Sequence, residues 1–231
     1  MPEEQKNAIV IGASRGLGLG LVKEFLERGW LVTATYRSAE TAKDLLELSE
    51  ANSALTLESV DINKPELVAD LARKLQGKKA DILFVNAGIS LGPDEKVQDV
   101  SREDFINLLA TNAYSPMQVI EALDGNVDKQ GVIAVMSSDL GSVENNLTGF
   151  WEVYRASKAS LNTFMKSRAA TKADQRAYLC LSPGWVRTDM GGEDAPLDVP
   201  TSASGLVETM LSQLGATGVQ FLNYEGKTVA W

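Results

Sequence analysis

Short apolar runs rich in β-branched residues alternate along the chain with segments of helical periodicity. The runs occupy residues 7–12, 31–36, 54–60, 80–85, 131–137, 176–182 and 218–222. Between two of them, Leu67, Leu71 and Leu75 mark a helical stripe. Strands that are apolar at nearly every position suit a parallel sheet covered on both faces. The pattern therefore predicts an α/β fold, a doubly wound, Rossmann-type parallel sheet of about seven strands with helices on both faces.

A glycine-rich turn follows the first apolar run and leads into an amphipathic segment. Its sequence is Gly12-Ala13-Ser14-Arg15-Gly16-Leu17-Gly18. A strand, a glycine turn and a helix in this order let backbone N–H groups approach a diphosphate at a helix N-terminus. The spacing is GxxxGxG, so a tight strand-to-helix turn without a ligand is the alternative. The turn predicts a bound dinucleotide.

Composition narrows the class of protein. With 231 residues, 44% of them hydrophobic and 23% charged, the chain suits one domain over residues 1–231. Its 22 basic and 31 acidic residues give a net charge of −9, which disfavours nucleic acid and anionic membranes as partners. We find neither a signal peptide nor an apolar run of about 18 residues, and we expect a cytoplasmic protein.

The absence of histidine limits the chemistry. It excludes Ser-His-Asp and Cys-His catalysis and the usual zinc sites, so we expect no metal. The single cysteine, Cys180, lies in an apolar run and is interpreted as a buried strand residue. Tyrosine, lysine, serine and carboxylates remain for proton transfer.

Polar residues and glycines follow several apolar runs directly. They are Arg37, Asp61, Asn86-Ala87-Gly88, Ser137-Ser138 and Pro183-Gly184. Ligands of open parallel sheets bind at the carboxyl ends of the strands, so these residues are expected at one edge. Further along, Tyr154 and Lys158 stand one helical turn apart on one face.

Taken together, these motifs resemble the short-chain dehydrogenase/reductase family over nearly the whole chain. The matching elements are Gly12-xxx-Gly16-x-Gly18, Asp61, Asn86-Ala87-Gly88, Asn112, Ser138-Asp139-Leu140-Gly141, Tyr154-xxx-Lys158 and Pro183-Gly184-Trp185-Val186-Arg187-Thr188. The details around residues 34–37 and 185–192 are most similar to the small C-factor-like branch. The resemblance implies an oxidoreductase that moves hydride between a nicotinamide cofactor and a carbonyl/alcohol pair.

The resemblance also implies the catalytic roles. Tyr154 would be the general acid in reduction, its pKa lowered by the Lys158 ammonium and the oxidised nicotinamide. Lys158 would also hold the nicotinamide ribose, and Ser138 would hydrogen-bond the substrate oxygen. Asn112 would hold a water that connects the lysine to solvent. Alternatively, Ser138 is a strand-end hydroxyl bonded to backbone, and Asn112 satisfies a helix that Pro116 bends.

A cofactor set follows from the same resemblance. It comprises Gly12, Ser14, Arg15, Gly16, Leu17, Gly18, Arg37, Asp61, Asn86, Ala87, Gly88, Pro183, Gly184, Val186 and Thr188, with Tyr154 and Lys158. Arg37 ends the second strand, where an acid would bind the ribose of NAD, and Arg15 adds a second cation for a 2′-phosphate. NADP is therefore predicted, the alternative being an Arg37 that is solvated and compensated by Glu40.

Substrate and assembly are less defined by the sequence. Phe150, Trp151, Trp185 and Met190 suggest an apolar or aromatic carbonyl, or else serve as core or cofactor packing. Family members pair through helices like those expected near 102–124 and 151–170, so a homodimer or homotetramer is predicted. The alternative function is a nucleotide-binding regulatory or signalling protein with little or no turnover.

Overall fold

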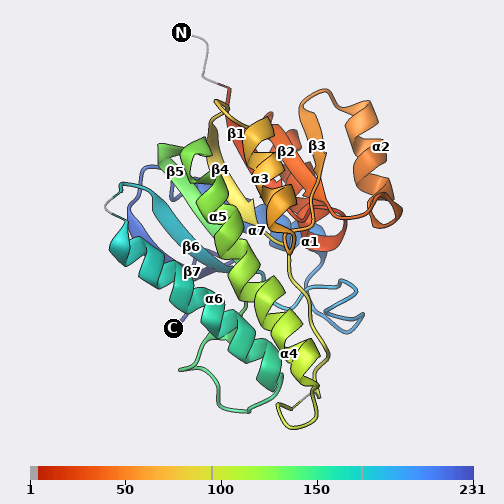
Figure 1. Cartoon of the computed structure of the whole chain (residues 1–231), viewed down its shortest axis with the longest axis vertical. Helices are drawn as coiled ribbons and strands as arrows, with labels where there is room; N and C mark the ends of the chain where they lie inside the picture. The colour runs from red at the N-terminus through yellow and green to blue at the C-terminus, as the bar shows by residue number, and fades with distance from the viewer. Residues whose placement is uncertain (1–4, 95, 173) are drawn as a thin grey trace.

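The seven-stranded parallel sheet predicted from the apolar runs is the centre of the molecule. A computed structural model describes residues 5–94, 96–172 and 174–231. Within them the strands are β1 (Asn7–Ile11), β2 (Leu31–Tyr36), β3 (Leu55–Ser59), β4 (Ala80–Val85), β5 (Val127–Met136), β6 (Ala177–Ser182) and β7 (Gly218–Asn223). All neighbouring pairs are parallel, in the order β3-β2-β1-β4-β5-β6-β7 (Figure 1). This order reverses between β1 and β4, which makes their carboxyl ends the ligand-binding edge.

Helices cover both faces of this sheet. They are α1 (Gly16–Glu27), α2 (Lys43–Ala51), α3 (Pro65–Lys74), α4 (Arg102–Leu109), α5 (Ser115–Leu123), α6 (Glu152–Thr171) and α7 (Val199–Leu211). One apolar cluster joins α1, α2 and α7 to the sheet, and a second joins α3, α5 and α6 to the opposite face. The chain therefore has the predicted Rossmann-type architecture of three layers.

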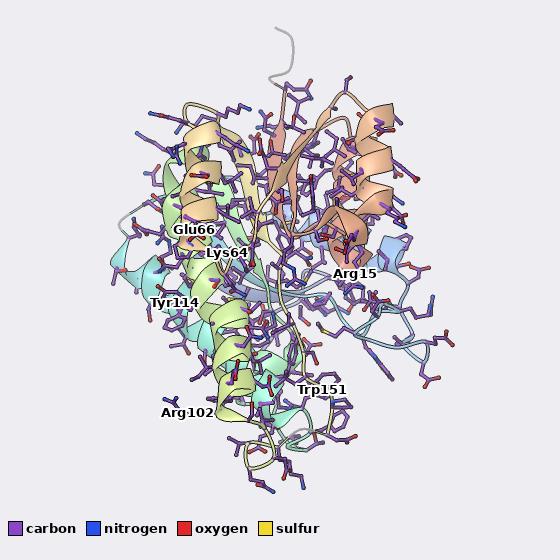
Figure 2. All side chains as sticks on the ribbon, turned by 45° about the vertical axis from the view of Figure 1, so that its right-hand side comes forward. Arg15, Lys64, Glu66, Arg102, Tyr114 and Trp151 are labelled. Carbon is purple, nitrogen blue, oxygen red and sulfur yellow. The ribbon has the colours of Figure 1, made fainter. Side chains whose placement is uncertain are left out.

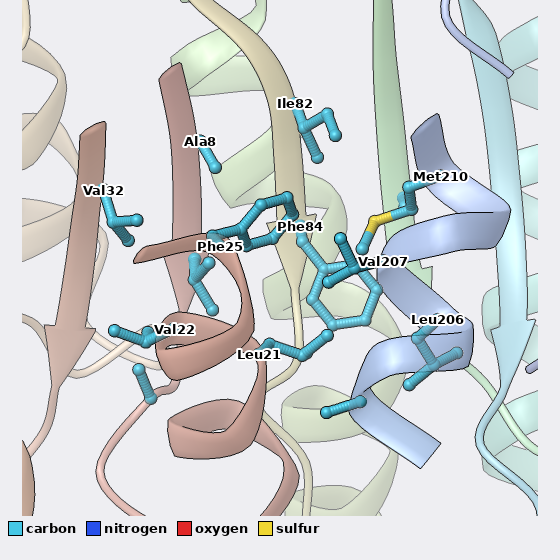
Figure 3. Packing of buried hydrophobic residues seen from close by; sticks show 14 of the residues in the cluster. Ala8, Leu21, Val22, Phe25, Val32, Ile82, Phe84, Leu206, Val207 and Met210 are labelled. Carbon is cyan, nitrogen blue, oxygen red and sulfur yellow. The ribbon is translucent and has the colours of Figure 1, made fainter. Parts of the chain in front are cut away.

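Successive residues of the central strands point to opposite faces, as the strand period requires. In β1, Ala8 and Val10 belong to the α1/α7 cluster, whereas Ile9 and Ile11 belong to the other. Figure 3 shows Phe25 of α1 and Val207 of α7 meeting side chains of the strands in the first cluster. Burial on both faces explains why these strands have no polar alternation.

The join between α4 and α5 is distorted just before Pro116, the residue at which a bend is predicted. The distortion is a π-helical turn, Ala110–Tyr114, that ends before the proline. Pro116 lies in the first turn of α5, which continues from this turn, and it has no N–H to donate to the carbonyls before it. Figure 2 labels Arg102 and Tyr114 along this column of helices. The distorted turn just before this proline sets the local geometry around Asn112.

One strand begins earlier than its apolar run. β5 starts at Val127, whereas the run predicts residue 131, because Asp128, Lys129 and Gln130 are exposed and polar. Val127 nevertheless pairs with Ala80 of β4, ahead of a register shift. Across the described ranges, no helix is long and apolar enough to cross a membrane.

Candidate active site

Two glycines of the turn between β1 and α1 are fixed by close packing. Gly12 has a φ of 86°, and a Cβ added there would lie 2.8 Å from the backbone N of Ala87. A Cβ on Gly18 would lie 2.2 Å from the Gly12 carbonyl oxygen. The Gly12 N–H donates to Thr35 Oγ1 of β2 at 3.0 Å. Neighbouring strands therefore hold the turn directly over the carboxyl end of the sheet.

The N-terminus of α1 retains the features needed to bind an anion. Arg15, at the N-cap position, makes no side-chain capping bond, and the first turn contains no acidic residue. Gly16 has a φ of 55°, with only Thr188 within 4 Å of an added Cβ. The first N–H groups of a helix lack intrahelical partners and favour negative charge. The turn from Ser14 to Gly18 therefore fits a diphosphate.

The segment after β4 lies between the glycine turn and α6. Asn86 Nδ2 donates to the Gly12 carbonyl at 2.7 Å. A Cβ on Gly88 would lie 3.3 Å from both Asn112 Oδ1 and Lys158 Nζ. The tertiary structure thus brings residues of four separate sequence motifs to one edge.

Asn112 is fully buried inside the π turn, and its side chain points away from its own helix. Its Oδ1 accepts from the Ile89 N–H at 2.8 Å. Its Nδ2 donates to the Ile89 carbonyl at 2.8 Å and to Ser157 Oγ at 3.0 Å. The alternative interpretation required Asn112 to bond to the backbone of its own bent helix, whereas its partners belong to the loop after β4 and to α6. Asn112 connects the loop after β4 to α6.

Tyr154 and Lys158 lie on the buried face of α6, as their spacing predicted. Lys158 Nζ donates to the Met136 carbonyl at 2.8 Å and lies 5.6 Å from the centre of the Tyr154 ring. Burial lowers the pKa of Lys158 to about 8. Burial raises the pKa of Tyr154 in the chain alone, whereas the predicted lowering depends also on the oxidised nicotinamide and stays a prediction. Desolvation disfavours the charged form of each group.

Ser138 lies two residues beyond the end of β5 and caps a short turn, Asp139–Gly141, that packs against α6. Its Oγ accepts from the Leu140 N–H at 3.1 Å, the backbone bond of the alternative interpretation, and the hydroxyl still has a proton to donate. A Cβ on Gly141 would lie 3.0 Å from Lys158 Cβ. The neighbouring Ser137 donates to Asn162 Oδ1 at 2.6 Å inside the core. Ser137 is thus a supporting residue, and Ser138 stays half-buried at the edge.

The two arginines proposed for a phosphate differ in their surroundings. Arg15 Nη1 lies 2.5 Å from Asp189 Oδ2, and both side chains are largely exposed. Arg37 is exposed beyond β2 and, among the described residues, makes no ion pair with an acid, including Glu40. Asp61, half-buried after β3, accepts from the Asn63 N–H at 3.0 Å.

The segment after β6 folds back on itself beside the glycine turn. Gly184 has a φ of 76°, and a Cβ there would lie 2.6 Å from Leu197 Cδ1. Val186 bridges to Leu197, and Pro183 accepts a bond from Ser202 at 2.7 Å. Thr188 Oγ1 accepts from the Gly191 N–H at 3.1 Å. The segment borders the turn on the side facing α7.

Trp151, at the N-cap of α6, has an unusual backbone. Its φ of 63° and ψ of 42° are left-handed, and no other non-glycine residue in the described ranges has a positive φ. Such a conformation costs a bulky residue of the order of 1–3 kcal/mol. Its ring lies 5.5 Å from that of Tyr154 and 6.0 Å from that of Phe150, between centroids.

Several supporting residues had no signal in the sequence. Ser157 Oγ accepts a hydrogen bond from Asn112, and Asn63 donates to Oγ1 of Thr111, the residue before Asn112, at 2.8 Å. Thr35 accepts a hydrogen bond from the glycine turn. All are small polar side chains whose partners are 23 residues or more away along the chain, so no local pattern marks them. The only sequence signal for Asp189 is its negative charge close to the predicted site.

Comparisons with known proteins agree with this geometry. Residues 6–196 match the short chain dehydrogenase family. A Burkholderia multivorans protein, described as a short-chain dehydrogenase/reductase with bound NADP, is 44% identical, with a TM-score of 0.96 over 99% of this chain and 100% of that one. A carbonyl reductase from Pseudomonas aeruginosa PAO1, in complex with NADP, is 37% identical, with a TM-score of 0.91 over 99% and 100%. The C-signal protein of Myxococcus xanthus is 34% identical over 65% of this chain and 92% of its own.

Proposed function

Because the chain belongs to the short-chain dehydrogenase/reductase family, we propose that it is an NADP-dependent oxidoreductase that interconverts a carbonyl compound and its alcohol. The observation that carries the proposal is the buried Tyr154–Lys158 pair, whose lysine lies beside Asn112 and Gly88. NADP-bound relatives of 44% and 37% identity support the cofactor. The test is NADPH oxidation with a panel of aldehydes, ketones and quinones, and no oxidation with any of them would reject the proposal.

The proposed chemistry divides the work among the chain's own residues. The cofactor, when bound, supplies the hydride. Gly16, Leu17 and Gly18 bind its diphosphate through backbone N–H groups, and Lys158 holds a ribose. Ser138 donates a hydrogen bond to the substrate oxygen, and Tyr154 gives that oxygen its proton.

The raised pKa of Tyr154 favours one direction of this chemistry. A protonated phenol is the form that gives a proton to a carbonyl oxygen, and burial keeps Tyr154 in that form. Alcohol oxidation needs the phenolate instead. We therefore expect reduction to be favoured near neutral pH and oxidation to accelerate as the pH rises. Initial rates in both directions from pH 6 to 10 test this, and an oxidation rate that falls with pH contradicts it.

The first cofactor prediction concerns Arg37. Replacing it with Asp should weaken NADPH binding by about 1–3 kcal/mol, because charge-assisted hydrogen bonds to the 2′-phosphate are lost. The affinity for NADH, which lacks that phosphate, should change much less. Calorimetry with both nucleotides measures the difference. Arg102→Asp, the same charge change on exposed α4, is the control, and equal wild-type affinities for NADPH and NADH would rule the assignment out.

The second cofactor prediction concerns the ion pair between Arg15 and Asp189. Replacing Asp189 with Asn should free the guanidinium and remove a negative charge from the phosphate site. Since exposed pairs contribute about 0–1 kcal/mol, NADPH should bind roughly two- to fivefold more tightly. The gain should shrink at high salt. Calorimetry at two ionic strengths tests this, and weaker NADPH binding by the variant would show that Asp189 supports the cofactor.

A regulatory, nucleotide-binding function is the second candidate. The observation in its favour is the 34% identity with the Myxococcus xanthus protein named C-signal. A protein that only binds nucleotide has no need of a buried proton donor, so the Tyr154 geometry favours the enzyme. Tight NADPH binding with no turnover of any carbonyl would favour the regulatory function.

Assembly and location stay predictions. Exposed apolar side chains on the helices proposed for pairing, Ile106, Tyr114 and Phe164, are 45–57% accessible. We propose a homodimer or homotetramer that buries them. Light scattering at micromolar protein measures the mass, and a monomer contradicts the proposal. Cell fractionation tests the proposed cytoplasmic location.

A further inference from the structure

The backbone of Trp151 is held left-handed by bonds from several directions. Its N–H donates to the Pro93 carbonyl at 3.2 Å, and its carbonyl accepts from the Arg155 N–H at 2.8 Å. The Arg155 side chain donates to the carbonyl of Phe150, the preceding residue. Glu152 accepts from the Val97 N–H at 3.1 Å, which ties the loop after β4 to the same turn. The surrounding structure therefore imposes the unfavourable conformation on Trp151.

Core packing does not account for this conformation. Trp151 is only half-buried, and it belongs to neither of the two apolar clusters that stabilise the sheet. Gly149, two residues before Trp151, also has a positive φ, 69°, but glycine has no Cβ and adopts this conformation without penalty. A bulky side chain kept at a strained, half-exposed position indicates a functional constraint.

The strained backbone places the indole beside the proposed proton donor. Trp151 and Tyr154 are three residues apart at the start of α6, and their rings meet at 63° with centroids 5.5 Å apart. The Phe150 ring also contacts the indole, at an interplanar angle of 89°, and Phe150 is 51% exposed. The three rings form an apolar corner that continues from Tyr154 toward solvent. Figure 2 shows Trp151 among the loops at the end of the molecule remote from the N-terminus.

We propose that Trp151 is a substrate-selecting residue, whose indole packs against the planar, apolar substituent of the carbonyl compound that Tyr154 protonates. The inference rests on the proposed function, because it places the carbonyl oxygen at Tyr154. Aromatic rings gain more from contact with an indole than saturated rings of similar size do. The left-handed backbone at residue 151 fixes the direction from which that substituent approaches.

The test compares benzaldehyde with cyclohexanecarbaldehyde, which have the same number of ring carbons but differ in planarity. We expect the wild type to prefer benzaldehyde in kcat/KM. Trp151→Ala should lower that preference about three- to tenfold, chiefly through KM, and Trp151→Phe should restore most of it. Trp30→Phe, a tryptophan truncation just before β2 and therefore at the end of that strand opposite the site, is the control and should leave the preference unchanged. An unchanged preference in Trp151→Ala would overturn the proposal.

A second comparison tests the backbone separately from the substrate. Glycine adopts a φ of 63° without the Cβ penalty of alanine, so Trp151→Gly should unfold at a higher denaturant concentration than Trp151→Ala. Both variants should show the same loss of substrate preference. A Trp151→Gly protein less stable than Trp151→Ala would contradict an imposed left-handed backbone.

A binding measurement separates this proposal from the proposed function. If the wild type reduces no carbonyl compound, the proposed function fails. Saturation-transfer NMR with benzyl alcohol and NADP⁺ then decides the role of Trp151. Weaker binding of benzyl alcohol to Trp151→Ala than to the wild type supports the selecting role, and equal binding overturns it.

Discussion

Replacing Tyr154 with Phe is expected to reduce carbonyl turnover about 100-fold or more while leaving NADPH affinity nearly unchanged. The substitution removes the hydroxyl and its proton but keeps the ring that packs against Trp151 and under Lys158. Loss of general acid catalysis therefore appears in kcat, whereas the nucleotide site stays intact. Steady-state kinetics and calorimetry on the same preparation measure the two quantities.

Tyr178→Phe is the matched control for this variant. Tyr178 is also buried, and its hydroxyl donates to Asp174 at 2.7 Å at the start of β6, the opposite end of that strand from the site. Its removal should cost stability and not turnover. If Tyr154→Phe keeps wild-type turnover of a good substrate, another group supplies the proton and the proposed role is wrong.

Replacing Lys158 with Met is expected to impair both turnover and NADPH binding. The side chain is 2% exposed, and its ammonium lies where the proposal requires it to hold a ribose and face Tyr154. Methionine fills a similar volume but neither donates hydrogen bonds nor carries charge. We expect a loss of about 100-fold or more in kcat/KM, together with a weaker calorimetric affinity for NADPH. Lys166→Met, on an exposed position of the same helix, should change neither.

The buried ammonium also predicts a pH dependence of stability. Burial lowers the pKa of Lys158 from 10.5 to about 8, so between these values the unfolded chain binds more protons than the folded chain. The free energy of unfolding therefore rises with pH between about 8 and 10.5, by at most about 1.4 kcal/mol per pH unit. Below pH 8 the buried ammonium of Lys158 destabilises the folded protein to its full extent. Denaturant unfolding of Tyr154→Phe, with and without Lys158→Met, isolates the effect because the phenol is absent from both. A stability difference that does not vary with pH contradicts a depressed lysine pKa.

Local sequence patterns were sufficient for the fold. Strands such as Ala80–Val85 are apolar at nearly every position because helices cover both faces of the sheet, and that continuous run is visible without a structure. The alternation of strands and helices along the chain then implied parallel pairing, since strands separated by helices return to the sheet in the same direction. The prediction was weaker at Val127–Gln130, where exposed polar residues conceal the beginning of β5.

The candidate site was predictable where its residues are close in sequence or follow a strand directly. Gly12 to Gly18 and the Tyr154–Lys158 pair are local motifs, and Asn86 follows β4 at an edge that every parallel strand shares. Supporting residues were not predictable in this way. Ser157 bonds to Asn112 across 45 positions of sequence, and no spacing rule connects two side chains that distant.

The sequence by itself determined the architecture, the glycine turn and the residue types available for proton transfer, because these depend on periodicity and on chemistry that each residue carries alone. Only the tertiary structure decided what depends on burial and on distant partners. In the chain alone the pKa of Tyr154 is raised because folding removes water from the phenol. Arg15 is paired because folding brings Asp189 to it across 174 positions. The left-handed Trp151 exists because Pro93 and Arg155 hold its backbone there, against its intrinsic preference.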